Sequence, residues 1–155
     1  MHAELAAFLV AAKRNTHAFD GHRSTVATVS TGARQREYQA GRFAYRDVHF
    51  GLARFSGQET VAQDDRVIWS MVYCGGVAPA VTDEAAIALI HSCLRQALYI
   101  VEAERPFRGP RAFGRDGLRY LDDSEGDLAA FRGAERITRD GTLVYRLDYC
   151  GGLIL

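Results

Sequence analysis

Two glutamates are the residues of this sequence best placed to do chemistry. Glu59 and Glu135 lie in the segments FSGQETV and FRGAERI, where each has a glycine two residues before it and a branched aliphatic residue two residues after it. If these segments are strands with their aromatic side chains inward, both carboxylates point into an apolar interior. An isolated buried carboxylate is costly, so it must be ion-paired, protonated or facing a cavity. Two interpretations stay open: an ion pair with an arginine, or a contact to a ligand.

The turn signal Asp140-Gly141 sets the expected register of the second hairpin. A three-residue loop that begins at Arg139, with the glycine in the left-handed conformation, pairs Glu135 with Tyr145. A two-residue turn pairs Glu135 with Arg146 instead. A one-residue slip moves every side chain to the other face, so only one register buries the apolar set. We favour the three-residue loop, because it gathers the aromatic and aliphatic side chains on one face.

The same geometry in the first hairpin pairs Glu59 with Trp69, so each glutamate is expected beside an aromatic ring. Aromatic rings with internal carboxylates favour a cationic or amine-bearing ligand. The predicted ligand-binding residues are Glu59, Trp69, Tyr73, Glu135, Tyr145, Tyr149 and Arg108.

Arg108 belongs to the stretch ERPFRGP at residues 104–110, which is dense in rigid turn residues. One interpretation is a clamp that binds an anion or a carboxylate through its arginines. The structural alternative is a helix exit, where Pro106 ends the helix and Arg105 interacts with its dipole. Tyr45, Asp47, Tyr120 and Asp122 likewise either line a pocket or form turns with buried phenols.

The three cysteines do not predict a metal centre. Cys74 and Cys150 each precede Gly-Gly and have no neighbouring ligands, whereas a zinc site requires four at close spacing. A catalytic pair of Cys150 with His49 is a remaining alternative. We expect no metal and no cofactor, and an odd number of thiols fits a reducing, cytoplasmic environment.

An internal repeat organises the chain. Residues 55–77 match residues 131–153 without a gap, at a constant offset of 76 (131 − 55). A helical stretch precedes each copy: residues 3–14, and a second helix capped by Thr82 that must stop before Pro106. The expected fold is α+β, with two tandem helix-plus-antiparallel-strand repeats related by a pseudo-twofold and the helices packed on one side of the sheet. Residues 1–155 form one domain, divided into halves at 1–77 and 82–155.

Composition excludes several function classes. The 155 residues carry no net charge, whereas nucleic-acid-binding modules usually have a basic field. No apolar run approaches the roughly 20 residues that cross a bilayer, and the amino end lacks a secretory signal layout. We therefore expect a cytoplasmic protein that binds neither nucleic acid nor membrane directly.

Four stretches carry a resemblance to a known family: YRDVHFG at 45–51, FSGQETV at 55–61, ERPFRGP at 104–110 and YRLDYCGGLI at 145–154. They resemble a bacterial domain-of-unknown-function family, number 5680, over nearly the whole chain. That family occurs as stand-alone proteins and behind XRE-type helix-turn-helix domains, which implies a sensing or effector-binding module. It has no established activity, so the resemblance supplies no catalytic residues. No helix-turn-helix fits before residue 16, so a direct transcriptional role is not expected.

The leading functional expectation is a small-molecule-binding domain with its cleft between the two repeats. One alternative is a hydrolase or isomerase that uses Glu59 and Glu135 as acid and base. Another is a homodimeric protein-interaction module, in which exposed Gly-Gly strand edges pair with a second copy. Binding rather than catalysis is expected.

Overall fold

A single antiparallel sheet contains every strand of residues 2–17 and 32–154, which the computed structural model describes. Its strand order is β1-β2-β3-β4-β8-β7-β6-β5. In chain order the elements are α1 (His2–Thr16), β1 (Arg34–Ala40), β2 (Phe43–Gly51), β3 (Arg54–Gln63), β4 (Arg66–Val77), α2 (Glu84–Tyr99), β5 (Ala112–Arg115), β6 (Leu118–Gly126), β7 (Ala130–Arg139) and β8 (Thr142–Leu153).

The junction of β4 with β8 corrects the predicted fold. These strands pair continuously, from Trp69 with Leu153 to Val77 with Tyr145. The prediction of two tandem helix-plus-strand repeats related by a pseudo-twofold is therefore wrong, because the strands form one eight-stranded sheet with two helices. The physical reason is that a four-stranded meander leaves unpaired backbone groups along its last strand. The open edges of the two meanders, β4 and β8, form hydrogen bonds with each other.

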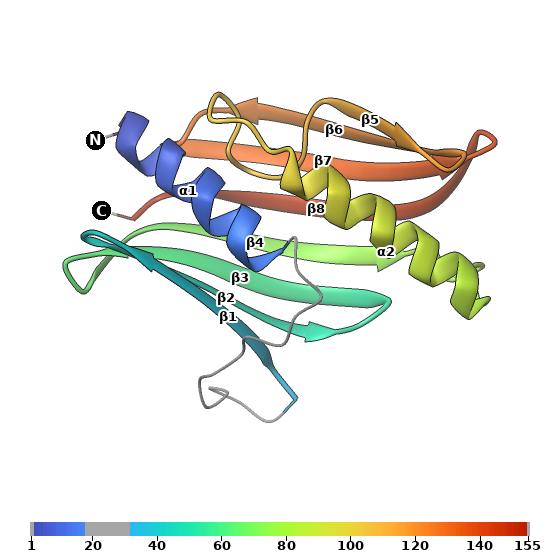
Figure 1. The fold of residues 1–155 in the computed structure, drawn as a ribbon, viewed down its shortest axis with the longest axis horizontal. Coiled ribbons are helices and arrows are strands. Elements are labelled where there is room, and N and C mark those ends of the chain that lie inside the picture. Colours follow the sequence, from blue (N-terminus) through green and yellow to red (C-terminus); the bar gives the residue numbers. More distant parts are fainter. Residues whose placement is uncertain (1, 18–31, 155) are drawn as a thin grey trace.

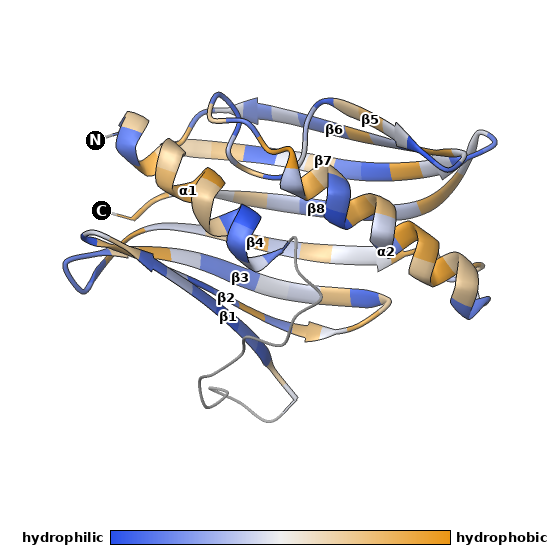
Figure 2. Ribbon diagram, viewed as in Figure 1, coloured by the Kyte–Doolittle hydropathy of each residue, from blue (hydrophilic) through white to orange (hydrophobic). Residues whose placement is uncertain are grey.

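Both helices lie over the same face of the sheet (Figure 1). In α1 the residues Leu5, Phe8, Leu9 and Ala12 are buried, as their helical spacing predicts. Apolar residues recur along both helices (Figure 2), and they share one core with the inward side chains of the strands. No helix of the described residues is long and apolar enough to cross a membrane.

The cap and the end of α2 differ from the prediction. Asp83, not Thr82, is the N-cap, and its carboxylate accepts a hydrogen bond of 2.7 Å from the backbone nitrogen of Ala86. A carboxylate also interacts favourably with the positive end of the helix dipole. The helix ends at Tyr99, well before Pro106, so that proline is not what stops it.

The hairpin registers also differ from the prediction. Asp140 and Gly141 both have positive φ and form a two-residue turn between the paired residues Arg139 and Thr142. The ladder then shifts at Ile137, which leaves one extra residue in β8, so Glu135 lies opposite Leu147 rather than Tyr145. In the β3–β4 hairpin a similar shift places Glu59 opposite Met71 rather than Trp69.

Candidate functional site

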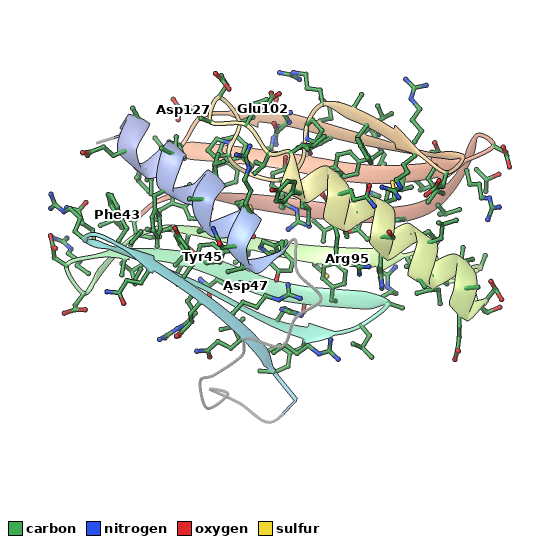
Figure 3. The ribbon with its side chains drawn as sticks, viewed as in Figure 1. Phe43, Tyr45, Asp47, Arg95, Glu102 and Asp127 are labelled. Atoms are coloured by element: carbon green, nitrogen blue, oxygen red, sulfur yellow. The ribbon has the colours of Figure 1, made fainter. Side chains whose placement is uncertain are left out.

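Four buried carboxylates lie on the inner face of the sheet, on the side of the helices. Asp47 lies opposite Glu59 across β2 and β3, and Asp122 lies opposite Glu135 across β6 and β7. All four side chains are buried. Figure 3 labels Asp47 on β2, below α1 in that view. Like charges directly opposite each other destabilise a sheet, so this arrangement depends on the cations and hydroxyls around it.

Glu59 is held by three basic side chains from outside the sheet. Lys13 of α1 donates a hydrogen bond from Nζ to Oε2 of Glu59. His17 Nε2 lies 3.6 Å and Arg108 Nη1 lies 3.8 Å from the other oxygen, Oε1. Burial alone raises the pKa of Glu59, but Lys13 and His17 outweigh it and hold the pKa below its usual value. The carboxylate is therefore ionised and structural in this position.

Glu135 accepts three hydrogen bonds. Arg108 donates one of 2.7 Å, and the hydroxyls of Tyr145 and Tyr120 donate one of 2.8 Å each. Tyr120 in turn accepts a hydrogen bond of 3.0 Å from the backbone nitrogen of Gly109. Burial works against the charge of Arg108, but Glu135 raises the pKa of that guanidinium well above its ordinary value. The ERPFRGP stretch thus clamps a carboxylate of its own chain.

Asp47 is held by a tyrosine and a histidine. Tyr73 donates a hydrogen bond of 2.5 Å to its Oδ1, and His49 Nδ1 lies 3.3 Å from its Oδ2. Arg36 is more distant, with Nη1 at 3.9 Å from Oδ2. Burial raises the pKa of Asp47, but His49, His17 and Tyr73 together lower it to about 2.

Asp122 differs from Asp47, because its pKa is raised rather than lowered. It accepts hydrogen bonds from Tyr149 at 2.8 Å and from Arg105 at 3.0 Å. Burial and the charge of Glu135 nevertheless raise the pKa of Asp122 to about 6. Arg105 also donates to Ser124, so it does not act at the end of the second helix as predicted, since that helix has ended at Tyr99.

A cavity of about 460 Å³ lies beside the Glu59 and Asp47 end of this network. Its walls come from the end of α1, the first four strands, α2 and the segment after α2. Its charged and imidazole-bearing lining residues are His17, Arg34, Arg36, His49, Glu84, His91, Arg95 and Arg108. Its larger apolar and aromatic lining residues are Leu52, Phe55, Tyr73, Ile87, Leu94 and Leu98. Arg95 lies beneath α2 in Figure 3.

Two nitrogen atoms of the lining residues are buried and have no partner within the described part of the chain: Nε2 of His91 and Nε of Arg108. Nδ1 of His49 also lacks a well-formed hydrogen bond, but it faces Oδ2 of Asp47 at 3.3 Å. Nearly all buried polar groups in folded proteins have partners, and an unsatisfied one costs about 1–3 kcal/mol. The two nitrogens at the cavity wall are therefore candidate contacts for a bound molecule.

The cavity includes only part of the predicted ligand-binding set. Tyr73 and Arg108 line it, whereas Glu59 and Glu135 are buried behind it in ion pairs. Trp69 lies in the core, stacked on Phe131 with ring centroids 5.7 Å apart. The remaining two tyrosines, Tyr145 and Tyr149, donate to the buried carboxylates instead.

Two other predicted sites also change. Cys150 is exposed, whereas His49 is buried on the inner face, so the alternative of a Cys150–His49 catalytic pair is wrong. Alternate residues of a strand point to opposite faces, which separates these two side chains. Tyr45, Asp47, Tyr120 and Asp122 are buried within strands rather than at turns. Within the described ranges no cluster of His, Cys, Asp and Glu is arranged to hold a metal ion.

Sequence reasoning missed His17, His91 and Arg36 as cavity residues, and it considered His49 only as a catalytic partner of Cys150. His17, His49 and His91 come from an helix end, a strand and a second helix, and no motif connects them. One signal was available for His91. It lies four residues after Ile87 and three before Leu94, so helical spacing places it on the same face as these apolar residues.

Comparison with known proteins gives one match. The family described as Domain of unknown function (DUF5680) matches residues 47–154. No curated protein and no solved structure matches the chain significantly. The matched range contains both hairpins and α2.

Proposed function

The chain belongs to the family Domain of unknown function (DUF5680), and we propose that it is a small-molecule-binding domain whose ligand occupies the cavity between α2 and β1–β4. The observation that carries this proposal is the pair of buried, unsatisfied nitrogens on His91 and Arg108 at the cavity wall. A ligand that accepts their hydrogen bonds removes a cost of about 1–3 kcal/mol for each.

The composition of the wall also favours a ligand site. Phe55, Ile87 and Leu98 give it apolar surface, and a few polar groups converge on the same space from separate elements. Small-molecule sites usually combine a largely apolar lining with a few placed polar groups, in cavities of roughly 300–1,000 Å³. A cavity of about 460 Å³ is of that size.

The alternatives receive less support. A hydrolase or isomerase that uses Glu59 and Glu135 would require both carboxylates to reach a substrate, but each is engaged by cations and neither lines the cavity. The homodimer hypothesis depended on Gly-Gly segments at sheet edges. Gly75 and Gly151 instead lie in β4 and β8, which pair with each other in the middle of the sheet.

Thermal-shift screening against a metabolite library tests the proposal, with one variant that fills the cavity and a matched control. Ala88 of α2 lines the cavity, whereas Ala85, one turn earlier, is exposed and does not. Ligand at 100 times its Kd stabilises the fold by about 2.7 kcal/mol. We expect hits that Ala88→Phe abolishes and Ala85→Phe retains. Hits that survive Ala88→Phe unchanged would place the ligand elsewhere and contradict the proposal.

A further inference from the structure

We propose that the ligand of this cavity is an amphipathic organic anion: a carboxylate or phosphate head bound by the arginines and histidines of the wall, with an apolar body against α2 and Phe55. This inference rests on the proposed function and adds the chemical class of the ligand. It reverses the amine expected from the sequence, because that expectation required the two glutamates to face the cavity.

The first step is the charge of the lining. Among the described lining residues are four arginines and one acid, Glu84 at the start of α2. Arg108 is paired with Glu135 and Glu59, which leaves Arg34 and Arg36 at the wall without a carboxylate in hydrogen-bond contact within the described chain. Arg34 forms no ion pair with any described residue, and its side chain is exposed at the cavity rim. The closest carboxylate to Arg36 in the described chain is 3.9 Å away. An ammonium group placed here would add a cation among cations.

The second step is that the nearby carboxylates are already occupied. Asp47 accepts from Tyr73, and Glu59 is bound by Lys13. The third, Glu135, accepts three hydrogen bonds behind Arg108. These three acids are engaged by side chains of their own chain behind the cavity. They therefore leave little negative charge for a cationic ligand.

The third step is the kind of hydrogen bond that the wall offers. The unsatisfied atom of Arg108 is Nε, which carries a proton and can only donate. Nε2 of His91 donates in the tautomer or charge state that leaves a proton on that nitrogen. Donors in a partly enclosed site are best satisfied by the several lone pairs of a carboxylate or a phosphate.

The fourth step explains why the anion must carry an apolar part. Ile87, Leu94 and Leu98 of α2 line the cavity together with Leu52 and Phe55. A free inorganic anion would leave this surface in contact with water. An organic body that covers it gains roughly 25 cal/mol per Å² of apolar surface buried.

A matched head-group series tests the inference, measured by isothermal titration calorimetry on the full chain. Decanoate, decyl phosphate, decanol and decylamine share one apolar body and differ in the head. We expect one of the two anions to bind at least tenfold tighter than decanol, with decylamine the weakest. Whichever anion binds more tightly identifies the head as a carboxylate or a phosphate. Ala88→Phe must abolish the binding, and Ala85→Phe must not.

Two matched charge variants sharpen the test. Arg36→Gln removes a cation from the wall, and Arg66→Gln removes one from an exposed position of β4 outside it. We expect about a tenfold loss of affinity for the anion in the first and no change in the second. Equal affinity for decanol and the anions, or tightest binding of decylamine, overturns the anionic assignment. If library compounds bind in an Ala88-dependent way while neither anion does, the inference fails and the proposed function stands.

Discussion

Glu59 and Glu135 meet opposite terminal nitrogens of a single guanidinium. Nη1 of Arg108 lies 3.8 Å from Oε1 of Glu59, and Nη2 donates a hydrogen bond of 2.7 Å to Oε1 of Glu135. Arg108 is buried, and it follows α2 in a segment outside the sheet. This one side chain therefore neutralises carboxylates on β3 and β7, which are separated in the sheet by β4 and β8.

Replacing Arg108 with methionine is expected to lower the free energy of unfolding by about 3–5 kcal/mol, because it leaves two buried carboxylates without their shared cation. Adding Glu135→Gln to Arg108→Met is expected to restore part of the loss, since the uncompensated charge is then removed. Urea unfolding of the single and double variants measures both effects. Strictly additive losses would contradict the pairing.

An exposed ion pair provides the control for this experiment. Arg132 and Glu125 also form an ion pair, but their side chains are 78% and 64% exposed. Surface ion pairs contribute about 0–1 kcal/mol to stability, so Arg132→Met is expected to lower the free energy of unfolding by no more than that.

The pH dependence of stability is expected to carry a signature of Asp122. Its pKa is raised to about 6 in the folded protein, from an ordinary value of 3.8. The folded state binds this proton more tightly, so the stabilisation is present below pH 3.8 and is lost as the pH rises through 6. At pH 7 the loss is about 3 kcal/mol.

Asp122→Asn removes this titration and keeps acceptors for Tyr149 and Arg105. We expect the variant to gain stability relative to the parent protein between pH 4 and pH 7, measured by urea unfolding across that range. Asp123→Asn at the next, exposed position is the control. If the difference in unfolding free energy between variant and parent were the same at every pH, that result would contradict the raised pKa of Asp122.

Two glycines are expected to be intolerant of alanine because a tyrosine ring covers each of them. A Cβ at Gly57 would overlap the hydroxyl of Tyr73, and a Cβ at Gly133 would overlap the ring of Tyr149. These hydroxyls donate to Asp47 and Asp122, so displacing the rings also disturbs the buried acids. Overpacking of this kind costs about 1–3 kcal/mol.

Gly114→Ala is the matched control for these substitutions, measured by thermal unfolding. The nearest atom to its added Cβ is 3.8 Å away, an ordinary contact. If Gly57→Ala were as stable as Gly114→Ala, the tyrosine would not be held over the glycine.

The identity of the α2 cap predicts a difference between two neighbouring substitutions. Asp83→Ala removes the side-chain acceptor for the backbone nitrogen of Ala86 and is expected to cost about 1 kcal/mol. Thr82→Ala removes no such bond and is expected to cost much less. If both variants lost the same unfolding free energy in denaturant, Asp83 and Thr82 would share the capping of α2.

The faces of the strands could be predicted from the sequence even where the register could not. Glu135 was expected opposite Tyr145 and lies opposite Leu147, an error of two residues. Because side chains alternate with a period of two, an even error leaves the residues beyond the shift, Glu135 among them, on their expected face. Leu143, between the turn and the shift, is 43% exposed instead. The burial of both glutamates beside aromatic residues was therefore predicted correctly. The extra residue in β8 that causes the shift has no signature in the sequence.

The pairing of distant strands and the packing of the helices could not be predicted from local sequence patterns. Nothing near Trp69 or Leu153 indicates that they pair, since either strand could equally have remained an edge. The cavity depends on the same kind of contact, because His17, His49 and His91 converge only when α1 and α2 pack on the sheet. The cation that satisfies Glu59, Lys13, is likewise supplied by a helix 46 positions away in the chain.

The place of β8 in the sheet has a consequence for synthesis on the ribosome. This strand lies between β4 and β7, so one edge of β4 stays unpaired until residues 142–153 have left the exit tunnel. Pairings between segments so distant in the chain form slowly, and an unpaired strand edge invites association with other chains. Emergence of β8, rather than of the first helix and its four strands, is therefore the step that allows this molecule to complete its native sheet.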